Sequence, residues 1–126
     1  MTKYIYEMVK HNYKNLKVWQ KSREFVKQVY VLSAKFPAEE KFGLISQIRR
    51  ACISIASNIA EGSARKSTKD QANFYQMAYS STLEVLNQLI ISTDLQFISN
   101  DNLNVCREKI ENISNKLNAL RNSILQ

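Results

Sequence analysis

The sequence predicts an all-α protein, an antiparallel up-down-up-down four-helix bundle. Glycine and proline are scarce, with two glycines and one proline in 126 residues, and so few turn-formers suit long helices joined by short turns. Apolar residues also recur at alternating steps of three and four, as one face of a helix requires. A chain of this length is expected to form one domain that buries about two thirds of its unfolded surface.

The first helix is expected at about residues 16–36, with Asn15 as its N-cap. Pro37 ends it, because its ring cannot continue a helix. The bundle is assigned to residues 14–126 and the preceding residues 1–13 to an N-terminal tail. Three tyrosines in this tail suggest docking on the bundle or on a neighbouring subunit, and a mobile terminus is the alternative.

The second helix, expected at about residues 42–61, contains the segment QIRRACISIASNIAEG, which combines isoleucines at helical spacing with small and polar residues. We interpret its polar residues, with one glutamate of the next helix, as the structural motif that specifies packing. Gly62 is expected to be a left-handed C-cap. The members of this motif are Gln47, Ser54, Asn58, Glu61, Gly62 and Glu84.

Two adjacent arginines in the second helix, Arg49 and Arg50, are about 100° apart on its surface. They cannot share one face. One is therefore expected to reach inward to a carboxylate, and the other to be exposed.

The third helix, at about residues 68–98, begins with the capping box Ser67-x-x-Asp70. Arg65, Lys66 and Lys69 surround its start, where free N–H groups favour a phosphate; a solvated basic turn is the alternative. The expected inward residues are Phe74, Tyr75, Ala78, Thr82, Val85, Leu86, Leu89 and Thr93.

The fourth helix, at about residues 101–125, carries the most regular pattern in the chain. Its apolar residues form a seam at steps of three and four, and the rest are mainly polar, so one face should be solvated. The seam consists of Leu103, Cys106, Ile110, Ile113, Leu117, Leu120 and Ile124.

The charge distribution favours a negatively charged partner. The formal net charge is +7, and residues 1–35 carry eight Lys and Arg against two glutamates. A polyanion or an acidic protein surface would suit this asymmetry, although a solvated basic helix face explains it equally well. The chain lacks an apolar run of about 18 residues and a signal-peptide core, so we expect a cytoplasmic protein that does not span the membrane.

Few residues suit catalysis, and we expect no enzyme, no cofactor and no metal. His11 is the only histidine, and Cys52 and Cys106 fall on apolar helical positions as small core residues. Glu61 and Glu84 are the carboxylates expected nearest the helix interfaces. We expect them to accept hydrogen bonds from Arg49, Asn58 or a helix terminus, and an acid–base or metal pair is the alternative.

Several motifs occur together in an order typical of one family. They are Tyr13–Lys21 (YKNLKVWQK), Phe36-Pro37, Gln47–Ala51 (QIRRA), Ser54-Ile55 and Asn58–Gly62 (NIAEG), followed by Arg65, Ser67, Ala78, Ser81 and Glu84. Over about residues 13–120 the chain closely resembles the four-helix-bundle proteins of the 23S rRNA intervening-sequence (S23) type.

This resemblance implies a homopentameric ring. It also implies similarity to the accessory variability determinant of diversity-generating retroelements, a basic pentameric barrel that binds a reverse transcriptase and nucleic acid. Other members of the family have no settled activity.

The sequence thus predicts a non-enzymatic, oligomeric module that binds RNA or DNA, or a ribonucleoprotein. The alternative is a protein-interaction scaffold or accessory subunit for an acidic partner or a reverse transcriptase. Candidate nucleic-acid-binding residues are Lys14, Lys17, Lys21, Arg23, Lys27, Arg49, Arg50, Arg65, Lys66 and Lys69.

Overall fold

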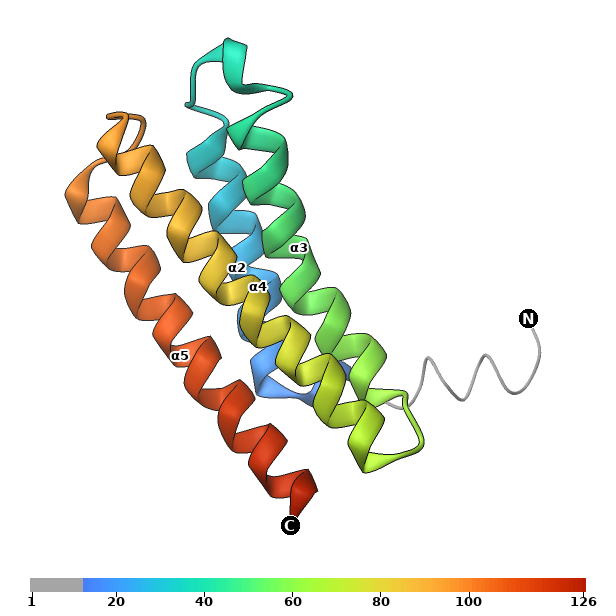
Figure 1. Cartoon of the computed structure of the whole chain (residues 1–126). Coiled ribbons are helices and arrows are strands. Elements are labelled where there is room, and N and C mark those ends of the chain that lie inside the picture. The colour runs from blue at the N-terminus through green and yellow to red at the C-terminus, as the bar shows by residue number, and fades with distance from the viewer. Residues whose placement is uncertain (1–12) are drawn as a thin grey trace.

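The computed structural model describes residues 13–126, so the predicted tail lies almost entirely outside the described residues. Four long helices run antiparallel in chain order and form the predicted up-down-up-down bundle (Figure 1). They are α2 (Lys17–Ser33), α3 (Leu44–Ser63), α4 (Thr68–Asp94) and α5 (Asn100–Leu125). Short 3-10 turns, η1 (Tyr13–Asn15) and η2 (Ala38–Glu40), precede α2 and α3. The fold-class prediction is therefore confirmed.

The core lies where the apolar stripes of the four helices meet. The α3–α4 contact is the most extensive, and the α2–α5 contact is much smaller. Full burial of each large aliphatic or aromatic side chain contributes roughly 1.5–3 kcal/mol, which makes this core the main source of stability. Its largest fully buried side chains include Phe25, Val29, Ile48, Ile55, Ile59, Val85, Leu89, Ile113 and Leu117.

Serine side chains cap the N-termini of α4 and α5, and the first of these was predicted by the capping box. The Asp70 N–H donates to Ser67 Oγ at 3.0 Å, and the Asn102 N–H donates to Ser99 Oγ at 3.1 Å. The prediction of Asn15 as an N-cap was wrong. Asn15 belongs to the turn η1, and Leu16 occupies the N-cap position without a side-chain hydrogen bond.

The helices α2 and α4 end earlier than predicted because two aromatic residues leave them to pack together. Phe36 is buried, and its ring centroid lies 5.5 Å from that of Phe97. After α4 the chain turns through Gln96, whose φ of 65° is left-handed. The N–H groups of Gln96 and Phe97 then donate to the carbonyls of Thr93 and Ser92, in the Schellman pattern of helix termination.

Gly62 has a different role from the C-cap predicted for it. It lies inside α3, and no glycine in the described part of the chain has a positive φ. A Cβ at this position would approach Tyr75 Cε1 to 2.8 Å and Phe74 Cβ to 2.9 Å. Glycine is therefore needed for the close approach of α4, and backbone conformation does not require it.

Candidate nucleic-acid interface

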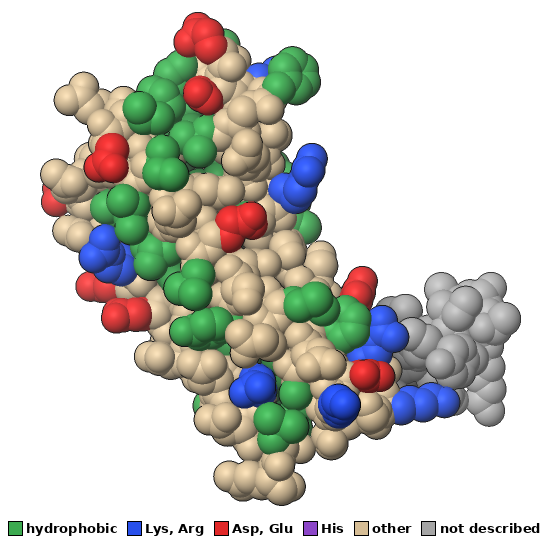
Figure 2. Space-filling view, viewed as in Figure 1, with side chains coloured by type: hydrophobic (Ala, Val, Ile, Leu, Met, Phe, Trp, Pro, Cys, Tyr) green, Lys and Arg blue, Asp and Glu red, His purple; other side chains and the backbone are tan. Residues whose placement is uncertain are grey.

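Positive charge is concentrated at one end of the bundle. Because the chain reverses at each turn, the start of α2, the end of α3, the start of α4 and the end of α5 lie together (Figure 1). In this half, formed by residues 13–25, 54–81 and 113–126, there are nine Lys and Arg against three Asp and Glu; the remaining described residues contain seven of each. We call this half the basic end. On the face shown in Figure 2, carboxylates predominate toward the opposite end.

The basic end brings together seven of the ten predicted cations. Two further cations, Lys116 and Arg121, were missed because the polar face of α5 was interpreted only as solvated. The antiparallel topology was the signal that could have found them, since it places the end of α5 beside the start of α2. The seven predicted cations are Lys14, Lys17, Lys21, Arg23, Arg65, Lys66 and Lys69.

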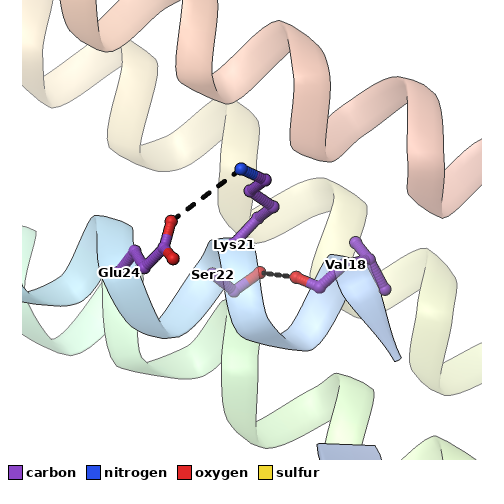
Figure 3. A network of polar contacts seen from close by, with 4 residues as sticks. All are labelled: Val18, Lys21, Ser22 and Glu24. Carbon is purple, nitrogen blue, oxygen red and sulfur yellow. Dashed lines mark hydrogen bonds and ion pairs between the residues drawn. The ribbon is translucent and has the colours of Figure 1, made fainter. Parts of the chain in front are cut away.

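These cations are mostly free of carboxylate partners within the described part of the chain. The only ion pair there joins Lys21 Nζ to Glu24 Oε2 at 4.0 Å, between two exposed side chains (Figure 3). Next to Lys21, the buried Ser22 hydroxyl donates to the Val18 carbonyl one turn earlier at 2.7 Å, so its polar group is satisfied within α2. An exposed pair of this kind is weak and can exchange for contacts with a phosphate.

The other three predicted cations, Lys27, Arg49 and Arg50, lie along the junction of α2 and α3. Two adjoining hollows run along this junction, with volumes of about 410 and 520 Å³, and Ile53 lines both. We call them together the α2–α3 groove. Between residues 13 and 126, its lining contains no carboxylate; its cations are Arg23, Lys27, Lys41, Arg49 and Arg50, and its aromatic residues are Tyr13, Trp19, Tyr30 and Phe42.

Cations lie over three of the aromatic rings of this groove. The distance from the guanidinium carbon to the ring centroid is 5.6 Å for Arg23 and Trp19, and 4.3 Å for Arg49 and Tyr30. Lys41 Nζ lies 5.4 Å from the centroid of Phe42. Such cation–π contacts hold the charged groups beside flat apolar surfaces.

Arg49 is the arginine that reaches inward, but the prediction that it pairs with a carboxylate was wrong. Its Nε donates to Ser33 Oγ at 2.8 Å, and its Nη2 donates to the Tyr30 carbonyl at 3.3 Å. Ser33 is fully buried, so this donor satisfies a hydroxyl that would otherwise lack a partner from another helix. Arg50 is exposed, as expected for the second arginine.

Part of the predicted polar motif links α3 to α4. Asn58 Nδ2 donates to the Ser54 carbonyl at 2.9 Å and to Ser54 Oγ at 3.0 Å, and Ser81 Oγ donates to the same hydroxyl at 3.0 Å. Gln47, another member of the motif, is exposed.

The roles predicted for Glu61 and Glu84 were wrong. Both side chains are exposed, and neither accepts a hydrogen bond within the described residues. They occupy outward positions on α3 and α4, where a carboxylate stays hydrated and needs no protein donor. In the described part of the chain, no group of three His, Cys, Asp or Glu residues could hold a metal ion.

The two cysteines are free and fully buried, as predicted for core residues. Desolvation, with a smaller contribution from neighbouring Cys106, raises the pKa of Cys52 to about 12. Desolvation also raises the pKa of Cys106 to about 11, although Lys109 opposes the shift. Because a thiol must ionise to react as a nucleophile or metal ligand, these residues are inert in the folded protein.

None of the helices between residues 13 and 126 has the length and apolar character that crossing a membrane requires.

Comparison with known proteins identifies the family. The chain is similar in fold to a protein of unknown function from the S23 ribosomal protein family of Bacteroides thetaiotaomicron, with a TM-score of 0.77 and 24% sequence identity over 83% of this chain and 95% of that one. A search of curated proteins gave no match. The sequence profile of the 23S rRNA-intervening sequence proteins matches residues 14–119. The chain belongs to the 23S rRNA-intervening sequence protein family.

Proposed function

We propose that this protein is a non-enzymatic, oligomeric module that binds structured RNA or a ribonucleoprotein through its basic end. The observation that carries the proposal is the uneven charge of the bundle. Nine Lys and Arg against three Asp and Glu occupy one half, whereas the other half carries equal numbers. A cluster of cations at one end of a compact domain attracts a polyanion and orients it.

Binding of this kind depends chiefly on phosphates. The cations of the basic end come from three helices and two turns, so they can contact several phosphates of a folded RNA at once. Each phosphate neutralised releases counterions, which makes the affinity fall steeply as salt rises. Little sequence preference is expected, because phosphate contacts position a protein on nucleic acid without reading its bases.

The test is titration of a labelled RNA hairpin at about 50 mM and 200 mM salt, salt values across which phosphate-driven binding weakens strongly. The test variant is Lys66→Glu with Lys69→Glu, at the basic end. The matched control is Lys35→Glu with Lys109→Glu, which changes the net charge equally in the other half. Lys69 lies in the first turn of α4, where an acidic residue favours the helix dipole, so this variant should remain folded.

The test variant is expected to weaken binding at least tenfold at the lower salt and to reduce the salt slope by about two, one unit for each lost phosphate contact. The control variant should lose much less affinity for the RNA. Equal losses in both variants would show that only net charge matters, and no binding by the unmodified protein would refute the proposal. A protein recovered by pull-down after nuclease treatment would instead favour the acidic-partner scaffold.

The proposal of a non-enzymatic role is supported by the positions of Glu61 and Glu84. Both are exposed and hydrated, which does not suit a pair held for acid–base chemistry. The RNA is therefore expected to stay intact when incubated with the protein and Mg²⁺. Cleavage that disappears in folded Glu61→Ala or Glu84→Ala variants would overturn this part of the proposal.

Assembly into an oligomer is supported by the outer surface of α4. Five large apolar side chains of this helix and the residue that follows it are exposed in the single chain, and Figure 2 shows hydrophobic patches over the same face. Exposed apolar residues at this density are typical of surfaces that another protein covers. They are Met77, Leu83, Ile90, Ile91 and Leu95.

A further inference from the structure

The α2–α3 groove combines cations with exposed aromatic rings. Four of its lining residues are aromatic, and the most prominent, Phe42, is 87% exposed, while Tyr30 is 38% exposed. An exposed phenylalanine makes no contribution to the core, and here it stands beside a second exposed ring and Ile53. The groove therefore offers flat apolar surfaces to a ligand.

The charge of the groove restricts what that ligand can be. Among the described residues its lining holds five cations and no carboxylate, so a neutral apolar helix would bring no negative charge to any of them. The same groove of a second copy would bring like charges together, which is unfavourable. Charge complementarity instead selects a polyanion that also carries apolar groups.

The rings are distributed along the length of the groove. Trp19 lies near the start of α2 and Tyr30 near its end, and Phe42 precedes α3 at the same end of the bundle as Tyr30. The 17 residues of α2 extend over about 25 Å. Arg23, Arg49 and Lys41 each lie over one of these rings, so every one of the three rings has a cation beside it.

We infer that the α2–α3 groove binds an unpaired segment of nucleic acid, with its bases stacked on Trp19, Tyr30 and Phe42 or on the guanidinium planes beside them. Base stacking on aromatic rings combined with a basic channel is the general means of binding single strands. Paired bases hide their faces within the duplex, so a duplex could use the cations but not the rings. This inference rests on the proposed function and adds the class of nucleic acid that this groove takes.

The test uses the full chain with two probes, a labelled 12-nucleotide oligouridylate and a 12-base-pair RNA duplex. Trp19 is the only tryptophan in the chain and lines the groove, so its fluorescence reports the site directly. The test variants are Phe42→Ala and Tyr30→Ala. The matched control is Val31→Ala, which alters a side chain on α2 that is 63% exposed but does not line the groove.

The single strand is expected to quench the fluorescence of Trp19, and the duplex is not. Phe42→Ala should weaken binding of the single strand about tenfold and leave duplex binding unchanged, because each stacked base contributes about that much. Tyr30→Ala should have the same selective effect, and Val31→Ala should have none. Circular dichroism establishes that the variants are folded.

Three results would overturn the inference, and they are distinguishable. Equal binding of both probes with no quenching and no effect of Phe42→Ala would leave the proposed function intact but reject the stacking site. A change in sedimentation of the Phe42→Ala variant without RNA would assign the groove to a contact between copies of the chain. Failure of both probes to bind at low salt would reject the proposed function together with the inference.

Discussion

The Gln96 backbone is strained where α4 ends. Its φ of 65° lies in the left-handed region, where a side chain costs roughly 1–2 kcal/mol and glycine costs little. The position is fixed because the N–H groups of Gln96 and Phe97 close the helix end and the Phe97 ring packs on Phe36. The unfavourable conformation at Gln96 thus accompanies the packing of the partly buried Phe97 ring on the buried Phe36.

Gln96→Gly is therefore expected to increase the free energy of unfolding by about 0.5–1 kcal/mol, since relief of strain exceeds the extra entropy of the unfolded chain. Urea denaturation at fixed protein concentration measures the change. The control is Gln76→Gly on the exposed face of α4, which should lose a similar amount because its backbone is helical. Loss of stability in Gln96→Gly would show that the glutamine side chain itself stabilises the turn.

A side chain added at position 62 would have two opposing effects on the stability of the protein. Within a helix, alanine is favoured over glycine by about 1 kcal/mol. A Cβ here, however, would stand 2.8 Å from Tyr75 Cε1, far inside ordinary contact distance, and Tyr75 is buried. Gly62→Ala is expected to lower the free energy of unfolding by about 1–3 kcal/mol, because overpacking outweighs propensity. Thermal unfolding measures this.

A suitable control for Gly62→Ala is Ser57→Ala, on the exposed face of the same helix. It should change stability by less than about 0.5 kcal/mol. If Gly62→Ala proved stabilising, α4 would have to shift easily, and the contact of Gly62 with Tyr75 could not be a packing constraint.

Arg49 shows how one side chain joins two elements. Its guanidinium donates to the buried Ser33 hydroxyl and to the Tyr30 carbonyl at the end of α2, and it stacks on the Tyr30 ring. Lysine keeps the charge but cannot reproduce the planar, forked geometry. Arg49→Lys is expected to lower the free energy of unfolding by about 1–2 kcal/mol, as expected for loss of a partly buried charged hydrogen bond.

The neighbouring residue provides a matched control for this prediction. Arg50→Lys makes the same chemical change on an exposed side chain and should stay within about 0.5 kcal/mol of the unmodified protein in the same urea denaturation. Equal effects of the two substitutions would mean that the Ser33 and Tyr30 contacts do not stabilise the α2–α3 pairing.

The sequence predicts a helix well where one hydrophobic period persists along the whole helix. The seam of α5 alternates steps of three and four for seven residues, and five of these are buried while Leu120 and Ile124 pack against the core. Helix ends were harder to predict, because tertiary contacts decide them: Phe36 leaves α2 to reach Phe97. Glu61 and Glu84 were misplaced because a one-dimensional pattern does not show how each helix is rotated in the bundle.

The candidate site became visible only in the whole molecule. Sequence patterns identified ten cations but not their grouping, which depends on four antiparallel helices returning to the same end. Lys116 and Arg121 were missed for this reason. The α2–α3 groove was not predicted either, because its aromatic rings come from both sides of the turn between α2 and α3. Phe42 was expected to begin the second helix, which instead starts at Leu44.

The outer surface of α4 leads to a prediction for the whole assembly. The exposed apolar residues of this helix lie in a stretch, residues 70–106, that contains no Lys or Arg. Leu83 and Ile90 are seven residues apart and therefore on the same side of the helix. We expect sedimentation velocity at micromolar concentration to show an oligomer of the 14.6 kDa chain, a pentamer if the family resemblance extends to assembly.

Substitution of Leu83→Glu together with Ile90→Glu is expected to dissociate this oligomer. It removes two apolar contacts of about 1.5–3 kcal/mol each when buried, and it adds negative charge beside Glu84 and Asp94. Val31→Glu, on an exposed side chain of α2, should leave the sedimentation coefficient unchanged. A stable monomer of the unmodified protein would refute assembly, and dissociation by Val31→Glu alone would place the interface on α2. If only the α4 variant dissociates the oligomer, the interface lies on α4. In the intact oligomer the α2–α3 groove of every copy would then face solvent, and a single RNA could contact several copies at once.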